Sequence, residues 1–230
     1  MRRLVYWDID HTLIENSGIS KETYAAAYEA LTGETPRAEA VTEGRTDRSI
    51  MRGMFDAPGR RMPPWAEVEV ALAHAGSARF KALQKRGTAL PGVREALEAV
   101  RRMDGVVQSV LTGNIRENAL VKLAAFGLDG FLDLEVGAYG ADGDDRAELV
   151  PVARARAARA YAGVDDLTPM VLIGDTPRDV AAAFDSGVNI IAVASGVHDA
   201  VALSAAGAPF VLANLQETDA VLEAIEQALS

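Results

Sequence analysis

Two carboxylates follow a short apolar run near the start of the chain. The segment LVYWDIDHTLIE spans residues 4–15, and Asp8 and Asp10 come directly after the apolar stretch. Residues i and i+2 of an extended segment project to the same side, so both carboxylates can face one ligand while Ile9 is buried. Paired carboxylates at the end of a buried strand destabilise a fold unless something binds them. We therefore expect Asp8 and Asp10 to carry chemistry.

Polar or small residues also follow two later apolar segments, 106–111 and 170–173. They are Thr112, Gly113 and Asn114 after the first, and Asp175 and Asp179 after the second. In open α/β sheets, ligands bind beyond the carboxyl ends of the strands. Several carboxylates brought together there repel one another and favour a hard divalent cation such as Mg²⁺, which screens them from an anionic substrate. A phosphoryl group fits that description.

Five short apolar segments bounded by turn residues are typical of buried parallel strands. They are Leu4–Trp7, Val106–Leu111, Met170–Ile173, Asn189–Val193 and Phe210–Leu212. Helical spacing of apolar residues lies between them, as in Val93, Leu97, Val100 and Met103. This alternation predicts an α/β fold with a doubly wound parallel sheet.

Residues 15–87 interrupt this alternation of strands and helices, because they contain no convincing strand. They are better described as helices: Ser20 is expected to cap the first, Thr46 or Asp47 to begin the second, and Pro63-Pro64 to introduce the third. We expect residues 1–14 and 88–230 to form the core. Residues 15–87 would form an inserted all-helical cap domain over the carboxyl edge of the sheet.

Composition excludes several classes of function. The chain has 230 residues, no cysteine and a formal charge of −10, so thiol chemistry and disulfides are absent and binding to nucleic acid or anionic membranes is disfavoured. No apolar run reaches the roughly 18 to 20 residues that span a bilayer, and the apolar run at residues 4–7 is too short for a signal peptide. We expect a cytoplasmic monomer or homodimer whose partner is a small phosphorylated substrate.

The segments D-I-D-H-T-L, V-L-T-G-N and I-G-D-T-P-R-D resemble three of the four motifs of the haloacid dehalogenase superfamily. They occur in the family's order, and residues 15–87 occupy the place of its helical cap. The resemblance implies a Rossmann-like core and a Mg²⁺-dependent phosphomonoester hydrolase that works through an aspartyl-phosphate. Phosphoglycolate is the substrate that we consider first.

The resemblance also implies roles for individual residues. Asp8 would be the nucleophile, and Asp10 would protonate the leaving oxygen and then activate water. The Mg²⁺ ligands would be the Asp8 side chain, the backbone carbonyl of Asp10 and Asp175, with Asp179 as a ligand or as support. Thr112 would donate its hydroxyl to a phosphoryl oxygen.

We place Gly113 and Asn114 beside Thr112 among the substrate-binding residues. Asn114 with Glu117 also fits a helix cap, and Thr176 with Asp179 fits a capping box that needs no metal. These structural interpretations stay open at the level of the sequence.

Two positions depart from the family pattern. His11 replaces a usual glycine; it is either tolerated in the turn, since histidine is enriched at positive φ, or it contacts the substrate. The family's lysine motif is matched by Arg146 in GDDRAELVP, in a chain with 19 arginines and 4 lysines. Lys122 is the rival, but eight residues of helix beyond Asn114 correspond to about 12 Å.

Substrate recognition is the least determined feature. The stretch Gly44-Arg45-Thr46-Asp47 resembles the specificity loop of phosphoglycolate phosphatase-like and phosphoglucomutase-like relatives. Arg45 could hold a carboxylate or a second anionic group bidentately, or it could be a surface arginine. The alternatives to a phosphatase are a β-phosphoglucomutase-like phosphotransferase, a 2-haloacid dehalogenase and a catalytically silent binding module.

Overall fold

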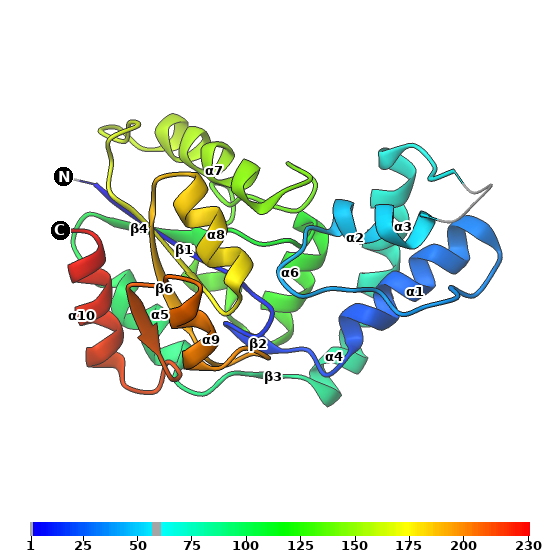
Figure 1. The fold of residues 1–230 in the computed structure, drawn as a ribbon, viewed down its shortest axis with the longest axis horizontal. Helices are drawn as coiled ribbons and strands as arrows, with labels where there is room; N and C mark the ends of the chain where they lie inside the picture. Colours follow the sequence, from blue (N-terminus) through cyan, green and yellow to red (C-terminus); the bar gives the residue numbers. More distant parts are fainter. Residues whose placement is uncertain (1, 57–60) are drawn as a thin grey trace.

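A five-stranded parallel sheet forms the centre of the computed structural model, which describes residues 2–56 and 61–230 (Figure 1). Its strand order is β4-β1-β5-β6-β7. The strands are β1 (Arg3–Trp7), β4 (Val106–Val110), β5 (Met170–Gly174), β6 (Asn189–Val193) and β7 (Phe210–Leu212). Each agrees with its predicted segment to within one residue at either end.

Helices cover both faces of the sheet. One face is covered by α5 (Val93–Arg101), α6 (Arg116–Ala125) and α10 (Thr218–Ala228), and the other by α7 (Arg146–Ala160), α8 (Pro177–Asp185) and α9 (Ala200–Ala205). A single 3₁₀ turn, η1 (Asp129–Phe131), follows α6. Alternate side chains of β1 enter the two layers: Val5 and Trp7 pack in the first, Leu4 and Tyr6 in the second. The predicted doubly wound α/β fold is confirmed.

Among the residues that the structure describes, four helices lie between two very short strands near the limits of the predicted insertion. These helices, here called the helical insertion, are α1 (Ile19–Thr32), α2 (Asp47–Phe55), α3 (Trp65–Ala78) and α4 (Phe80–Arg86). The strands β2 (Ile14–Glu15) and β3 (Thr88–Ala89) pair antiparallel where the chain leaves and re-enters the core. Figure 1 shows the insertion beyond the end of the sheet toward which β1 runs. The two-residue strands were not predicted because they are too short to produce a pattern.

The starts of α1, α2 and α3 were predicted with one error, whereas α4 was not predicted. Thr46 caps α2 by accepting a hydrogen bond from Ser49 N at 3.2 Å, and Pro64 directly precedes α3. Ser20 does not cap α1, because the helix begins at Ile19 after Gly18, whose φ is 80°. Ser20 therefore lies inside the first turn, and its hydroxyl is free to contact the core.

None of the described helices combines the length and the apolar character needed to cross a membrane. The longest helix of the sheet layers, α7, has 15 residues, whereas a bilayer requires about 20.

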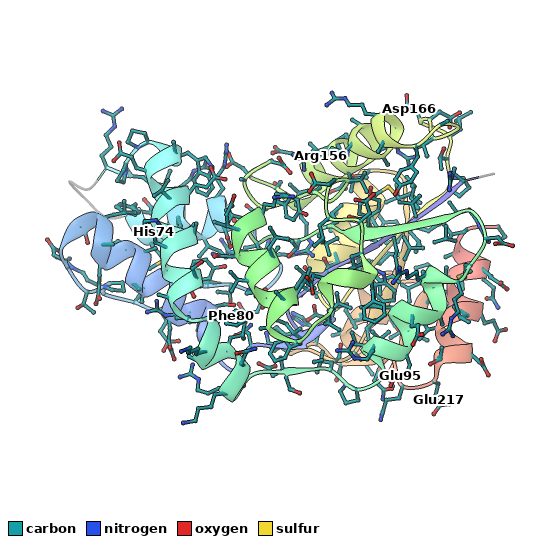
Figure 2. All side chains as sticks on the ribbon, turned by 180° about the vertical axis from the view of Figure 1, so that it is seen from behind. His74, Phe80, Glu95, Arg156, Asp166 and Glu217 are labelled. Carbon is teal, nitrogen blue, oxygen red and sulfur yellow. The ribbon has the colours of Figure 1, made fainter. Side chains whose placement is uncertain are left out.

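Arg156 of α7, labelled in Figure 2, pairs with Asp142 at 2.6 Å. His74, labelled on α3 in the same figure, is exposed.

Candidate active site

The carboxyl ends of three strands meet at one small cavity of about 50 Å³. Asp8 follows β1, Thr112 follows β4 and Asp175 follows β5, and all three line the cavity. The other predicted residues that line it are Asp10, His11, Arg45, Gly113, Asn114 and Arg146. Asp179 lies just behind this wall. The topology thus brings together residues that are distant in the sequence.

Asp8 and Arg146 form a buried ion pair at the floor of the cavity. Arg146 Nη2 lies 2.8 Å from Asp8 Oδ1, and both side chains are less than one tenth exposed. Burial raises the pKa of Asp8; the guanidinium of Arg146 opposes that rise, while Asp179 and Asp10 add to it. No described residue donates to Asp8 Oδ2, so one carboxylate oxygen remains open to a ligand.

Asp8, Asp175 and Asp179 form a buried acidic cluster. One carboxylate oxygen from each lies within 4.8 Å of the others. Burial raises the pKa of Asp175 well above its usual range, and the charges of Asp179 and Asp8 raise it further. Arg146 alone does not compensate three carboxylates. The donor set of clustered oxygens with excess negative charge is suited to a hard divalent cation.

Asp179 has both of its oxygens engaged by the protein. Oδ2 accepts hydrogen bonds from Thr176 N at 2.9 Å and from Thr176 Oγ1 at 2.7 Å. Oδ1 lies 2.5 Å from Arg146 Nε, as an ion pair without hydrogen-bond alignment. The capping box predicted for Thr176 and Asp179 is therefore present at the start of α8. This arrangement favours support of the cluster over direct ligation.

Asp10 lies at the rim of the cavity and accepts hydrogen bonds from four side chains of the core and the insertion, one of them Ser20, whose Oγ donates to Oδ1 at 3.4 Å. Oδ2 accepts from Lys122 Nζ at 2.6 Å and from Asn114 Nδ2 at 2.8 Å, and Oδ1 accepts from Asn16 Nδ2 at 2.8 Å. Burial on its own raises the pKa of Asp10. The charge and hydrogen bond of Lys122, with the hydrogen bond of Asn114, outweigh burial and lower that pKa to about 2.

The position of Lys122 contradicts the estimate made from the sequence. Its ammonium lies 2.6 Å from Asn114 Oδ1, although the rise along a helix suggested about 12 Å. That estimate measured backbone positions only. Side chains of a helix tilt toward its N-terminus, and lysine adds a flexible four-carbon stem. Lys122 therefore reaches the site together with Arg146, and the two cations pair with different aspartates.

The loop after β4 has a different geometry from a simple helix cap. The helix α6 begins at Arg116 after Ile115, so the predicted cap by Asn114 is wrong. Instead, Asn114 donates to Thr112 Oγ1 at 2.8 Å. A Cβ atom on Gly113 would lie 2.0 Å from the carbonyl oxygen of Arg45. Gly113 is thus required for the close approach of the insertion to this loop.

His11 adopts the positive φ that the sequence made plausible. Its φ is 60°, and its Nδ1 lies 2.9 Å from Glu15 Oε2. The ring also lines the cavity, so both interpretations of His11 agree with the structure. His198 lines the cavity as well and is half-buried, and it was not identified from the sequence as a site residue. Its place after β6, at the same edge of the sheet, is the signal that could have identified it.

The insertion contributes Arg45 to the wall of the cavity. The Nε atom of Arg45 is buried and has no hydrogen-bond partner among the described residues.

Nearby, the buried carboxyl group of Asp47 accepts from Tyr24 OH at 2.6 Å and from Ile115 N at 2.8 Å. Burial raises the pKa of Asp47 to about 6, against these hydrogen bonds. Asp47 was predicted only as a helix start, because its buried partners come from distant segments.

Comparison with known proteins assigns the class. The family model of haloacid dehalogenase-like hydrolases matches residues 5–183, so the chain belongs to this hydrolase family and the predicted enzyme class is confirmed. The chain is 28% identical to the probable phosphatase IndB of Dickeya dadantii over 216 residues, which cover 90% of this chain and 87% of IndB.

Two solved structures share the whole fold. CbbY of Rhodobacter sphaeroides, in complex with phosphate, superposes with a TM-score of 0.69 and 17% identity, covering 94% of this chain and 96% of CbbY. A predicted phosphoglycolate phosphatase of Haemophilus somnus gives a TM-score of 0.65 and 15% identity, covering 97% of both chains. At these identities the likeness concerns the fold alone.

Proposed function

We propose that the protein is a Mg²⁺-dependent phosphomonoester hydrolase that transfers the phosphoryl group of a small metabolite to Asp8 and then to water. The observation that carries this proposal is that Asp8 contacts one fixed cation, Arg146, and also belongs to the buried acidic cluster with Asp175 and Asp179. The family match and the similarity to a probable phosphatase support it.

Mg²⁺ would be held by Asp8, the backbone carbonyl of Asp10 and Asp175, with Asp179 as support. When bound, it would neutralise phosphoryl charge next to the carboxylates. Burial and neighbouring carboxylates raise the pKa values of Asp8 and Asp175. A bound cation would relieve the repulsion between these carboxylates, which supports the fit of Mg²⁺ to this cluster. We propose this ligand set from the donor chemistry of the residues.

The two aspartates would divide the chemistry. An oxygen of Asp8 attacks phosphorus while the bond to the leaving oxygen breaks, and Asp10 gives that oxygen a proton. Water then attacks the aspartyl-phosphate, Asp10 takes up a proton, and phosphate leaves with restoration of the Asp8 carboxylate. The present contacts of Asp10 suit its carboxylate form, which is the form that accepts the proton of the attacking water.

The remaining residues would position the phosphoryl group. The Thr112 hydroxyl and the loop through Gly113 and Asn114 lie at its side, and Arg146 would share the charge of the equatorial oxygens. Fixed donors of this kind stabilise the transition state without reorganisation.

The helical insertion would act as a cap domain that supplies substrate recognition. Arg45 enters the cavity wall with an unpartnered Nε, which supports its role as a ligand for a carboxylate or second anionic group. Phosphoglycolate carries such a group and is the first substrate to test. His11 would contribute from the turn after β1.

A Mg²⁺-dependent assay tests the proposal. Hydrolysis of p-nitrophenyl phosphate and of a panel of phosphorylated metabolites, including phosphoglycolate, should require Mg²⁺ and stop in EDTA. Absence of hydrolysis across the panel would favour the silent binding module. Turnover of 2-haloacids in EDTA would favour a dehalogenase.

A phosphomutase remains the second candidate because the insertion closely covers the loop after β4. The backbone amide of Asp47 donates to Gly113 O at 2.7 Å, and such closure excludes water. Transfer of phosphate from a sugar bisphosphate to a sugar hydroxyl, faster than release of inorganic phosphate, would identify this activity.

A further inference from the structure

Lys122 has its ammonium group fully engaged behind the wall of the candidate active site. Nζ lies 2.6 Å from Asp10 Oδ2, 2.6 Å from Asn114 Oδ1 and 2.8 Å from Ser20 Oγ. A lysine ammonium has three donors, and each has a partner. These partners line the cavity, whereas Lys122 does not. Its contacts therefore reach the reaction only through other residues.

The three partners come from three different parts of the chain. Asp10 follows β1, Asn114 follows β4, and Ser20 belongs to the first turn of α1 in the insertion. Lys122 is thus a single group that joins the rim of the sheet to the start of the insertion. Asn16, on the same side, holds the other oxygen of Asp10. The orientation of the Asp10 carboxyl group is fixed from both the core and the insertion.

Stability alone is a poor explanation for this lysine. Its side chain is only 8% exposed, and removal of an ammonium from water costs several kcal/mol unless its partners compensate fully. An apolar residue of similar length would fill the same volume in α6. A cation here does something an apolar residue cannot, because it holds a carboxylate in one orientation at the rim of the cavity.

We propose that Lys122 is a positioning residue that fixes the Asp10 carboxyl group for proton transfer and links that orientation to the insertion through Ser20. This role rests on the proposed function, since it requires Asp10 to protonate the leaving oxygen. Arg146 has a separate task, because it contacts the nucleophile Asp8 and lines the cavity.

A pair of substrates with different leaving groups separates positioning of Asp10 from general damage. Phenyl phosphate and p-nitrophenyl phosphate have the same ring, but phenolate is the poorer leaving group and needs the proton more. The ratio of their kcat/KM values therefore reports the protonation step. General acid catalysis contributes about 10²- to 10⁴-fold, so Lys122→Met should lower kcat/KM for phenyl phosphate at least tenfold more than for p-nitrophenyl phosphate.

Matched variants complete the experiment. Lys85→Met, at an exposed position of α4, should leave the ratio unchanged, and Arg146→Ala should lower both values by similar factors. Ser20→Ala keeps the ion pair between Lys122 and Asp10 but removes two contacts of the Ser20 hydroxyl, which accepts from Lys122 Nζ at 2.8 Å and donates to Asp10 Oδ1 at 3.4 Å. It should therefore shift the ratio in the same direction, by about threefold. Circular dichroism and melting curves verify that each variant is folded.

Each result decides the proposal. Equal losses on both substrates in folded Lys122→Met would overturn the positioning role while the parent enzyme remains an active phosphatase. If Lys122→Met does not fold, Ser20→Ala decides, and an unchanged ratio there overturns the proposal. A parent enzyme that hydrolyses neither ester would instead contradict the proposed function, and the role of Lys122 with it.

Discussion

Arg146 Nη2 lies 2.8 Å from Asp8 Oδ1 at the floor of the cavity, with both side chains buried. A buried guanidinium beside the proposed nucleophile is placed to share the charge of a phosphoryl group. It also compensates part of the acidic cluster, because Nε faces Asp179. Arg146 therefore affects both catalysis and stability.

Removal of Arg146 should severely reduce turnover. Loss of a fixed positive group at a phosphoryl site costs on the order of 10²-fold or more, so we expect Arg146→Ala to lower kcat at least a hundredfold. Arg146→Lys should recover part of this loss, since it restores the charge without the bidentate geometry. Arg159→Ala, at an exposed position of the same helix, is the control. Steady-state kinetics that show parent-like kcat for Arg146→Ala would contradict the assignment.

Asp8→Asn should abolish turnover without loss of stability. The amide cannot attack phosphorus. Because the pKa of Asp8 is raised in the folded state, its ionisation opposes folding above that group's usual pKa, and the neutral amide removes this penalty. We expect a melting temperature equal to or higher than that of the parent in metal-free buffer. Retained hydrolysis would exclude the covalent mechanism.

Metal binding should be visible in the melting temperature. A ligand that binds only the folded state stabilises it, by about 2.7 kcal/mol at a hundredfold excess over Kd. Mg²⁺ should therefore raise the melting temperature of the parent, and EDTA should reverse the rise. Asp175→Asn should abolish both this shift and the activity. Asp185→Asn, at an exposed position in α8, should preserve both; an equal Mg²⁺ shift in the two variants would contradict the site.

The sequence predicted the sheet better than the contacts of the site. Short apolar segments with turn residues on both sides locate strands well, because this pattern is typical of buried parallel strands. The edge rule for such sheets then placed Asp8, Thr112 and Asp175 together, as the structure shows. The division into core and cap, and the role of each residue, remain predictions.

Contacts between distant segments could not be obtained from local patterns. Ser20 and Asn114 both have the residue types and spacing of helix caps, yet their side chains face Lys122. Lys122 itself was placed too far away, because distance along a helix says nothing of where a long side chain ends. His198 has no local motif, and only the packing of the loops places it at the cavity. Asp47 was expected only as a helix start or as part of the stretch after Gly44, and its buried contacts with Tyr24 and Ile115 come from packing.

Asp47 should make stability depend on pH. Its pKa rises from 3.8 to about 6 on folding, so the folded state binds a proton more tightly than the unfolded chain does. The stabilisation is fully present below pH 3.8 and is lost as the pH rises through 6. The total is on the order of 3 kcal/mol. Asp47→Asn cannot titrate, so the free energy of unfolding of the parent should fall relative to this variant between pH 4 and pH 8 in denaturant titrations. Parallel curves would contradict the buried, partly protonated carboxyl group.

Arg45 should determine recognition of a second anionic group on the substrate. Its buried Nε lacks a hydrogen-bond partner among the described residues, and its side chain lines the cavity. A bidentate contact to a carboxylate would satisfy this nitrogen and add a charge-assisted hydrogen bond, which contributes roughly 1.5 to 3 kcal/mol. That energy corresponds to about a tenfold to hundredfold change in affinity.

We therefore expect Arg45→Met to raise KM for phosphoglycolate at least tenfold more than KM for p-nitrophenyl phosphate, which has no carboxylate. The effect belongs mainly in KM, because the contact is made equally in the ground state and the transition state. Arg45→Lys should recover only part of the difference, since a single ammonium cannot reproduce the planar pair of donors. Arg37→Met, a substitution on the insertion away from this cavity, is the control. If Arg45→Met raises both KM values by the same factor, Arg45 does not recognise the carboxylate of phosphoglycolate. It then binds the phosphoryl group or supports the insertion.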